Sequence, residues 1–121
     1  MSKTQDVELR TRTKTYALRI IHLYSSLPKT TLAQVLGKQL LRSGTSVGAQ
    51  YREAQRAKSD ADFVNKLEDS LQELDETGYW LELLMESKTI GEAQLNPLVQ
   101  ETNELIAILV TIVNKIKGKR K

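Results

Sequence analysis

The chain has 121 residues, which fits one domain with an ordinary core. Apolar residues make up 40% of it and charged residues 27%, which excludes a disordered chain, and the absence of cysteine excludes disulfides, thiolate metal sites and cysteine nucleophiles. The net charge of +3 is uneven, since residues 1–27 carry +3, residues 28–58 +5, residues 59–90 −7 and residues 91–121 +2. Such asymmetry bears on partners rather than on fold.

The sequence predicts neither a targeting segment nor a membrane span. Its first residues are polar and lack the apolar stretch of a signal peptide. The longest apolar run, residues 105–113, is broken by Thr111 and would cover about 13 Å of helix, whereas a bilayer needs about 20 residues. We therefore expect a soluble cytoplasmic protein.

Two helices are predicted in the first half of the chain. Apolar residues at three- and four-residue steps predict one over residues 7–26, which Pro28 ends. The second, over residues 31–57, is expected to open with the capping box Thr31-x-x-Gln34, in which both side chains satisfy free backbone N–H groups.

The stretch LLRSGTSVGAQYREAQRA, residues 40–57, is unusual for the interior of a helix. It holds Gly44 and Gly48, yet the apolar step continues on both sides of them, so we expect one continuous helix. Each mid-helix glycine costs roughly 1 kcal/mol relative to alanine. Two of them indicate that another element approaches this helix closely.

The second half predicts two more helices. A capping box, Ser59-x-x-Asp62, opens one over residues 60–87. The last, over residues 92–117, starts either at its first residue or at the Asn-Pro signal of residues 96–97. Short connections between four such helices predict an all-α, antiparallel up-down-up-down four-helix bundle in a single domain, residues 1–121.

The last predicted helix carries more apolar surface than one bundle needs. Ile106, Val110 and Val113 lie off its main stripe, although a bundle helix requires only one buried stripe. Either the helix is deeply buried in a lopsided monomer, or the second stripe contacts another copy. We favour a homo-oligomer.

Three motifs carry a resemblance to a known family. They are the run LGKQLLRSGTSVGAQYREA of residues 36–54, the segment SDADF of residues 59–63, and ELDETGYWL of residues 73–81. Together they resemble the four-helix-bundle proteins encoded by intervening sequences in bacterial 23S ribosomal RNA genes, over about residues 13–117. The chain departs from the family pattern at Gln50, where the pattern has Asn.

The resemblance implies a ring-like homopentamer with no known enzymatic activity. Related proteins, the accessory variability determinants of diversity-generating retroelements, bind nucleic acid and a reverse transcriptase through a basic surface. The resemblance therefore leads us to expect three kinds of partner: further copies of the chain, RNA or DNA, and a reverse transcriptase.

The residues themselves offer little for catalysis. His22 is the only histidine, so the paired Glu-x-x-His pattern of a di-iron bundle cannot form. The segment of residues 44–48 lacks Gly-Lys-Ser/Thr and follows no strand, so it is not a phosphate loop. We expect no enzyme activity, no cofactor and no metal.

One carboxylate of the third predicted helix is expected to be partly buried. Glu73 shares a helical row with Thr77 and Trp80, and a buried carboxylate needs a partner. Arg42 and Arg52 are the candidates, and Arg42 is the predicted structural partner across the seam between the second and third helices.

Basic residues are the best functional signal. Repeated around an oligomer, they would create a large positive field that binds phosphates with strong salt dependence. The predicted nucleic-acid-binding residues are Arg10, Arg12, Lys14, Arg19, Arg42, Arg52, Arg56, Lys58, Lys115 and Lys117, with Lys119, Arg120 and Lys121 of the tail as additions. One alternative is a solvated basic face balanced by the acidic third helix. Another is a homo-oligomeric scaffold that recognises protein without nucleic acid.

Overall fold

The computed structural model describes residues 2–119, which form four α-helices and no strand. The helices are α1 (Lys3–Ser25), α2 (Thr31–Gln55), α3 (Asp60–Glu86) and α4 (Glu92–Lys119). The all-α prediction and the four helices are confirmed. Helix α1 begins at Lys3, earlier than predicted, because the Ser2 hydroxyl caps it by accepting a hydrogen bond from the Gln5 amide.

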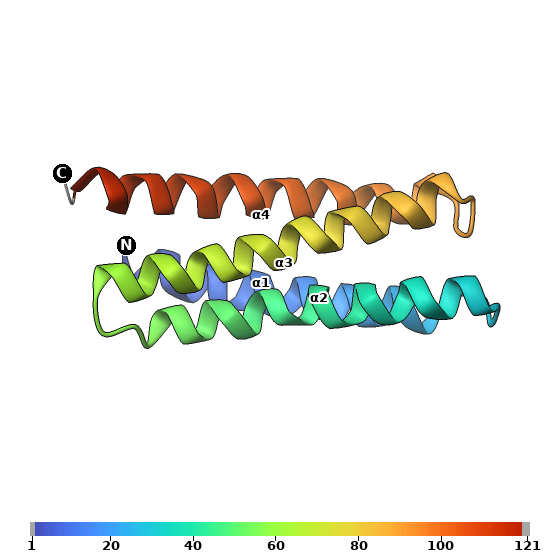
Figure 1. Ribbon diagram of the computed structural model, residues 1–121, viewed down its shortest axis with the longest axis horizontal. Helices are drawn as coiled ribbons and strands as arrows, with labels where there is room; N and C mark the ends of the chain where they lie inside the picture. Colours follow the sequence, from blue (N-terminus) through green and yellow to red (C-terminus); the bar gives the residue numbers. More distant parts are fainter. Residues whose placement is uncertain (1, 120–121) are drawn as a thin grey trace.

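The helices lie side by side in an up-down-up-down bundle (Figure 1). The start of α1, the end of α4 and the α2–α3 connection share one end, which we call the terminal end; the other two connections share the opposite end. Among neighbouring helices, packing is closest between α2 and α3 and sparsest between α1 and α4. Within residues 2–119, the backbones of α1 and α3 are not neighbours, so these two helices are diagonal, although the Tyr16 side chain of α1 reaches Thr77 of α3 across the core.

The glycines of α2 lie where α1 packs against it. A Cβ added to Gly44 would lie 2.8 Å from Cγ1 of Ile20, and one added to Gly48 would lie 3.3 Å from Oγ1 of Thr13. The prediction that another element approaches this helix closely is therefore confirmed, and that element is α1. The helix also continues unbroken through both glycines, as predicted.

One predicted cap is wrong by a residue. The N-cap of α2 is Thr30 rather than Thr31, and its hydroxyl accepts a hydrogen bond from the Ala33 amide. The Gln34 side chain does not close the predicted capping box. It donates instead to the Pro28 carbonyl over 2.9 Å.

The other two helix starts agree with their sequence signals. Ser59 caps α3 by accepting from the Asp62 amide, and the Asp62 carboxylate accepts from the amide of Lys58. For α4, the earlier of the two predicted starts is correct, since the helix runs from Glu92 with Pro97 inside it.

The second apolar stripe of α4 is only partly exposed. Val113 is buried in the core, Ile106 packs against the core, and Val110 is 39% exposed. Among residues 2–119, no helix combines the length and the apolar character that crossing a bilayer requires.

Candidate nucleic-acid interface

The predicted basic residues do not share one face of the bundle. Some lie between α1 and α2, others are ion-paired across the α1–α4 and α2–α3 seams, and the rest lie at the terminal end or beside α4. The residues between α1 and α2 line a shared groove.

A groove between α1 and α2 has basic walls. Lys14 on α1 and Arg52 on α2 line it together with Gly48. Arg10 lies one helical turn before Lys14, and Arg56 lies one turn after Arg52, so both walls extend toward the terminal end. We call these four basic residues and the space between them the α1–α2 basic groove.

The base of the groove is made of small residues. Ala17 of α1 and Ala49 of α2 line it beside Gly48. Because Gly48 has no side chain, Thr13 packs directly against the α2 backbone. The close approach of the two helices brings their cationic walls near each other.

The sequence places few carboxylates around this groove, and one of them, Asp6, lies between α1 and α2 one turn before Arg10. No Asp or Glu occurs between Glu8 and Glu53. Within residues 2–119, none of the groove's four basic side chains forms an ion pair, and the one hydrogen bond among them runs from Arg10 Nη1 to Gln55 Oε1 over 3.4 Å. The groove therefore presents basic side chains that no ion pair neutralises.

Arg12, by contrast, forms ion pairs with carboxylates of α4. Its Nε and Nη2 donate to the two oxygens of Glu101 over 2.8 and 2.6 Å, and Nη2 also reaches Glu104 at 3.1 Å. Hydrogen bonding to Glu101 raises the pKa of Arg12. This bidentate pair ties α1 to α4, beside the 2.6 Å hydrogen bond between the hydroxyls of Tyr16 and Thr102.

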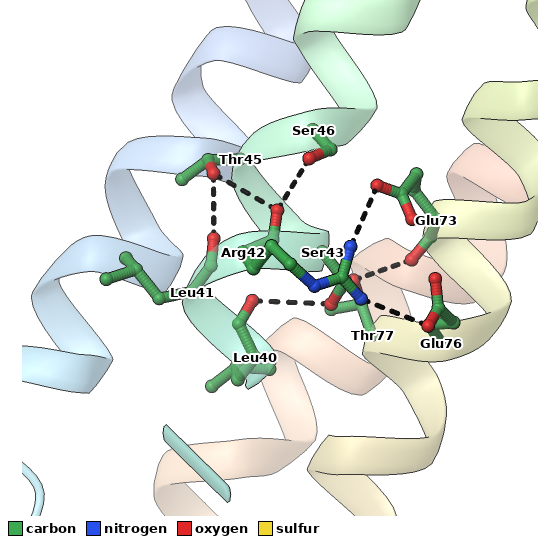
Figure 2. A network of polar contacts seen from close by, with 9 residues as sticks. All are labelled: Leu40, Leu41, Arg42, Ser43, Thr45, Ser46, Glu73, Glu76 and Thr77. Carbon is green, nitrogen blue, oxygen red and sulfur yellow. Dashed lines mark hydrogen bonds and ion pairs between the residues drawn. The ribbon is translucent and has the colours of Figure 1, made fainter. Parts of the chain in front are cut away.

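Arg42 forms ion pairs with carboxylates of α3, as Figure 2 shows. Its Nη1 lies 3.5 Å from Oε2 of Glu73, and its Nη2 lies closer, 3.0 Å, to Oε1 of Glu76. The structure thus brings the predicted pair together and adds Glu76 to it. Arg52, the other candidate for Glu73, lies on the α1–α2 side instead.

Hydroxyl groups line the seam beneath this ion pair (Figure 2). The Thr77 hydroxyl lies 2.8 Å from both the Ser43 hydroxyl and the Glu73 carbonyl. Burial raises the pKa of Glu73, and a hydrogen bond with Glu76 raises it further. The Ser46 hydroxyl and the charge of Arg42 act in the opposite direction.

The remaining predicted residues are scattered. Arg19 is half-buried between α1 and α4, beside Pro97 and Leu98. The other cations lie at the terminal end, where Lys117 Nζ is 3.5 Å from Glu68 Oε1. These cations are Lys58, Lys115, Lys117 and Lys119. Arg120 and Lys121 lie outside the described residues.

Two other residues singled out in the sequence have distinct surroundings. His22 is exposed on α1, beside a groove toward α4. Oε1 of Gln50, the residue that departs from the family pattern, is buried on α2 without a hydrogen-bond partner within residues 2–119. In that same range, no three His, Asp or Glu side chains gather in a way that could hold a metal ion.

The fold and the groove define a class: a small antiparallel four-helix bundle with a basic surface along its first two helices. The model of the family described as 23S rRNA-intervening sequence protein matches residues 5–111, and the chain belongs to this family. The resemblance predicted from the sequence is thereby confirmed.

A solved structure supports the same assignment. It is that of a protein of unknown function from the S23 ribosomal protein family of Bacteroides thetaiotaomicron VPI-5482, at 1.70 Å resolution. The two chains are 40% identical, the match covers 90% of this chain and 97% of that one, and the TM-score is 0.84. No curated protein matches this chain.

Proposed function

We propose that the protein is a non-catalytic nucleic-acid-binding accessory protein that holds RNA or DNA phosphates in the α1–α2 basic groove. The observation that carries the proposal is the groove itself. Lys14 and Arg52 line it, and within residues 2–119 neither forms an ion pair with a carboxylate. The family description refers to 23S rRNA intervening sequences, which makes a structured RNA the first ligand to test.

The chemistry of the groove favours phosphate contacts over base readout. Arginine and lysine that neutralise phosphates release condensed counterions, so the affinity falls steeply with salt. Contacts to phosphates fix the position of a nucleic acid but carry no sequence information. We therefore expect binding that is strong at low salt and tolerant of sequence.

The test is a salt titration of binding to a structured RNA and a duplex DNA by fluorescence anisotropy. The variant is Arg52→Glu with Arg56→Glu, which reverses the α2 wall of the groove. If both residues contact phosphates, affinity drops and the slope of log K against log salt becomes shallower by about 2. Light scattering and circular dichroism check that the variant keeps its fold and assembly.

A charge-matched control separates the groove from net charge. Lys29→Glu with Lys88→Glu changes the net charge by the same amount, and both residues are exposed in the connections at the end of the bundle opposite the terminal end. The control should retain most of the binding. Equal losses in both variants would show that net charge alone is responsible, and wild-type protein that binds neither ligand at low salt would end the proposal.

Exposed apolar side chains favour a second candidate, a homo-oligomeric protein-interaction scaffold. Leu18 is 56% exposed and Tyr79 is 54% exposed, on the diagonal helices α1 and α3. If the protein assembles but binds no nucleic acid at any salt concentration, this candidate takes precedence. Its partners would then be sought by pull-down.

A further inference from the structure

Four buried hydroxyl groups, one from each helix, form a polar layer near the middle of the bundle. They belong to Tyr16 of α1, Ser43 of α2, Thr77 of α3 and Thr102 of α4, and each of these residues is at most 1% exposed. Most of the core that surrounds them is aliphatic. We call these four residues the hydroxyl layer.

Hydrogen bonds connect the hydroxyl layer from helix to helix. The hydroxyls of Tyr16 and Thr102 lie 2.6 Å apart, and those of Thr77 and Ser43 lie 2.8 Å apart, the latter pair visible in Figure 2. The Tyr16 side chain also reaches Thr77 across the core. All four helices are therefore linked at one level by side-chain hydroxyls.

The apolar residues on either side of the layer do not by themselves fix the level of α1 against α4. Tyr16 and Thr102 each have a buried leucine seven positions before them and another seven positions after them. These leucines are Leu9 and Leu23 on α1, and Leu95 and Leu109 on α4. Seven residues of helix span about 10 Å, so a slide of α4 along α1 by that length would place leucine against leucine again. Among neighbouring helices these two also pack most sparsely, and no connection joins them directly.

The hydroxyl layer is what such a slide would disrupt. Tyr16 would then lie beside Leu95 or Leu109, and its phenol would lose the hydroxyl of Thr102. A buried polar group without a partner is costly, whereas replacing both partners by apolar groups of the same shape can be nearly neutral. The hydrogen bond therefore discriminates between levels more than it stabilises the correct one.

We infer that the hydroxyl layer selects one level of α1 against α4, a role in the specificity of the fold rather than in its stability. A single buried polar residue acts in this way in coiled coils, where it fixes register at a cost in stability. Arg12 forms ion pairs at the rim of the same seam, and it is kept in every variant below. The inference concerns the interior of one copy and does not depend on nucleic-acid binding.

The test removes both hydroxyls of the α1–α4 pair while keeping the shape of the core. In Tyr16→Phe with Thr102→Val, neither position leaves a partner unpaired at the other. The midpoint of urea unfolding should be equal to that of wild type or higher. In ¹H–¹³C spectra of labelled isoleucine methyl groups, wild type should give one signal per isoleucine. The double variant should give additional or broadened signals, because α1 and α4 then occupy more than one level.

Thr13→Val is the matched control. Thr13 is also 1% exposed on α1, but its hydroxyl bonds within its own helix, to the Leu9 carbonyl over 2.8 Å. This variant loses a buried hydroxyl without touching the layer, so it should keep one signal per isoleucine. A single set of signals in the double variant would overturn the inference, and so would equal heterogeneity in the control. A double variant that failed to fold, or that unfolded at a much lower urea concentration, would show that the layer stabilises the fold instead and would overturn it as well.

Discussion

At Glu73, burial and charge act against each other. Burial raises the pKa of this carboxyl group, and the nearby positive charge of Arg42 only partly offsets the effect. A carboxyl group whose pKa is higher in the folded chain than in the unfolded chain favours folding while it is protonated. Its contribution is complete below the pKa of the unfolded state and is lost as the pH rises through the raised pKa of the folded state.

We therefore expect Glu73→Gln to gain stability relative to wild type as the pH is raised from about 4 to 7. Glutamine cannot ionise, so the variant avoids the cost of holding a partly buried carboxylate. Urea denaturation across this pH range measures the effect, with the exposed Glu8→Gln as a control for general charge effects. A difference between variant and wild type that does not change with pH would contradict the argument.

The same residues show why one sequence prediction was more complete than another. Helical spacing placed Glu73 in one row with Thr77. In the structure this row faces α2, where Thr77 is hydrogen-bonded to Ser43. It did not identify Glu76 or Glu101 as arginine partners. Finding them requires the rotation of one helix relative to another, which the spacing within a single helix does not determine.

At the scale of the elements, the α1–α2 seam depends on the absence of side chains. We expect Gly44→Ala to lower the free energy of unfolding by about 1–2 kcal/mol, because its Cβ would collide with Ile20. This is the net loss, because the cost of the collision exceeds the roughly 1 kcal/mol that alanine gains in helix propensity. Thermal and urea denaturation would measure both effects at one fixed protein concentration.

Gly78→Ala is the matched comparison on α3. Its Cβ would lie 3.8 Å from the nearest side-chain atom, a Thr102 methyl carbon, which is an ordinary contact. The variant should therefore be up to about 1 kcal/mol more stable than wild type. If both alanines stabilised the protein equally, close packing at Gly44 would not be the reason for its glycine.

Local sequence signals predicted where the four helices lie, and the predicted start of α2 was wrong because two capping residues competed there. Consecutive threonines, Thr30 and Thr31, could each cap α2, and in the structure it is the Thr30 hydroxyl that accepts from the Ala33 amide. Helix α1 starts before the residue that apolar periodicity predicts, because the polar residues from Lys3 onward carry little of that periodicity. The local signal for this start is Ser2, whose hydroxyl caps the helix.

At the scale of the whole molecule, the folded structure separates cations that line the α1–α2 basic groove from cations that are ion-paired across helix seams. Net charge per segment predicted a basic half and an acidic third helix. It did not predict that Arg12 and Arg42 would be neutralised across seams while Lys14 and Arg52 would not.

The sparse packing between α1 and α4 also bears on how the chain folds. Most tertiary contacts join helices that follow one another in the sequence, whereas α1 and α4, the helices farthest apart in the chain, contribute few. Loop closure costs more entropy as loops lengthen, and proteins with few long-range contacts fold fast. The chain can therefore fold as successive helical hairpins. We expect the α1–α4 seam to close last during folding and to be the first to open in native-state hydrogen exchange.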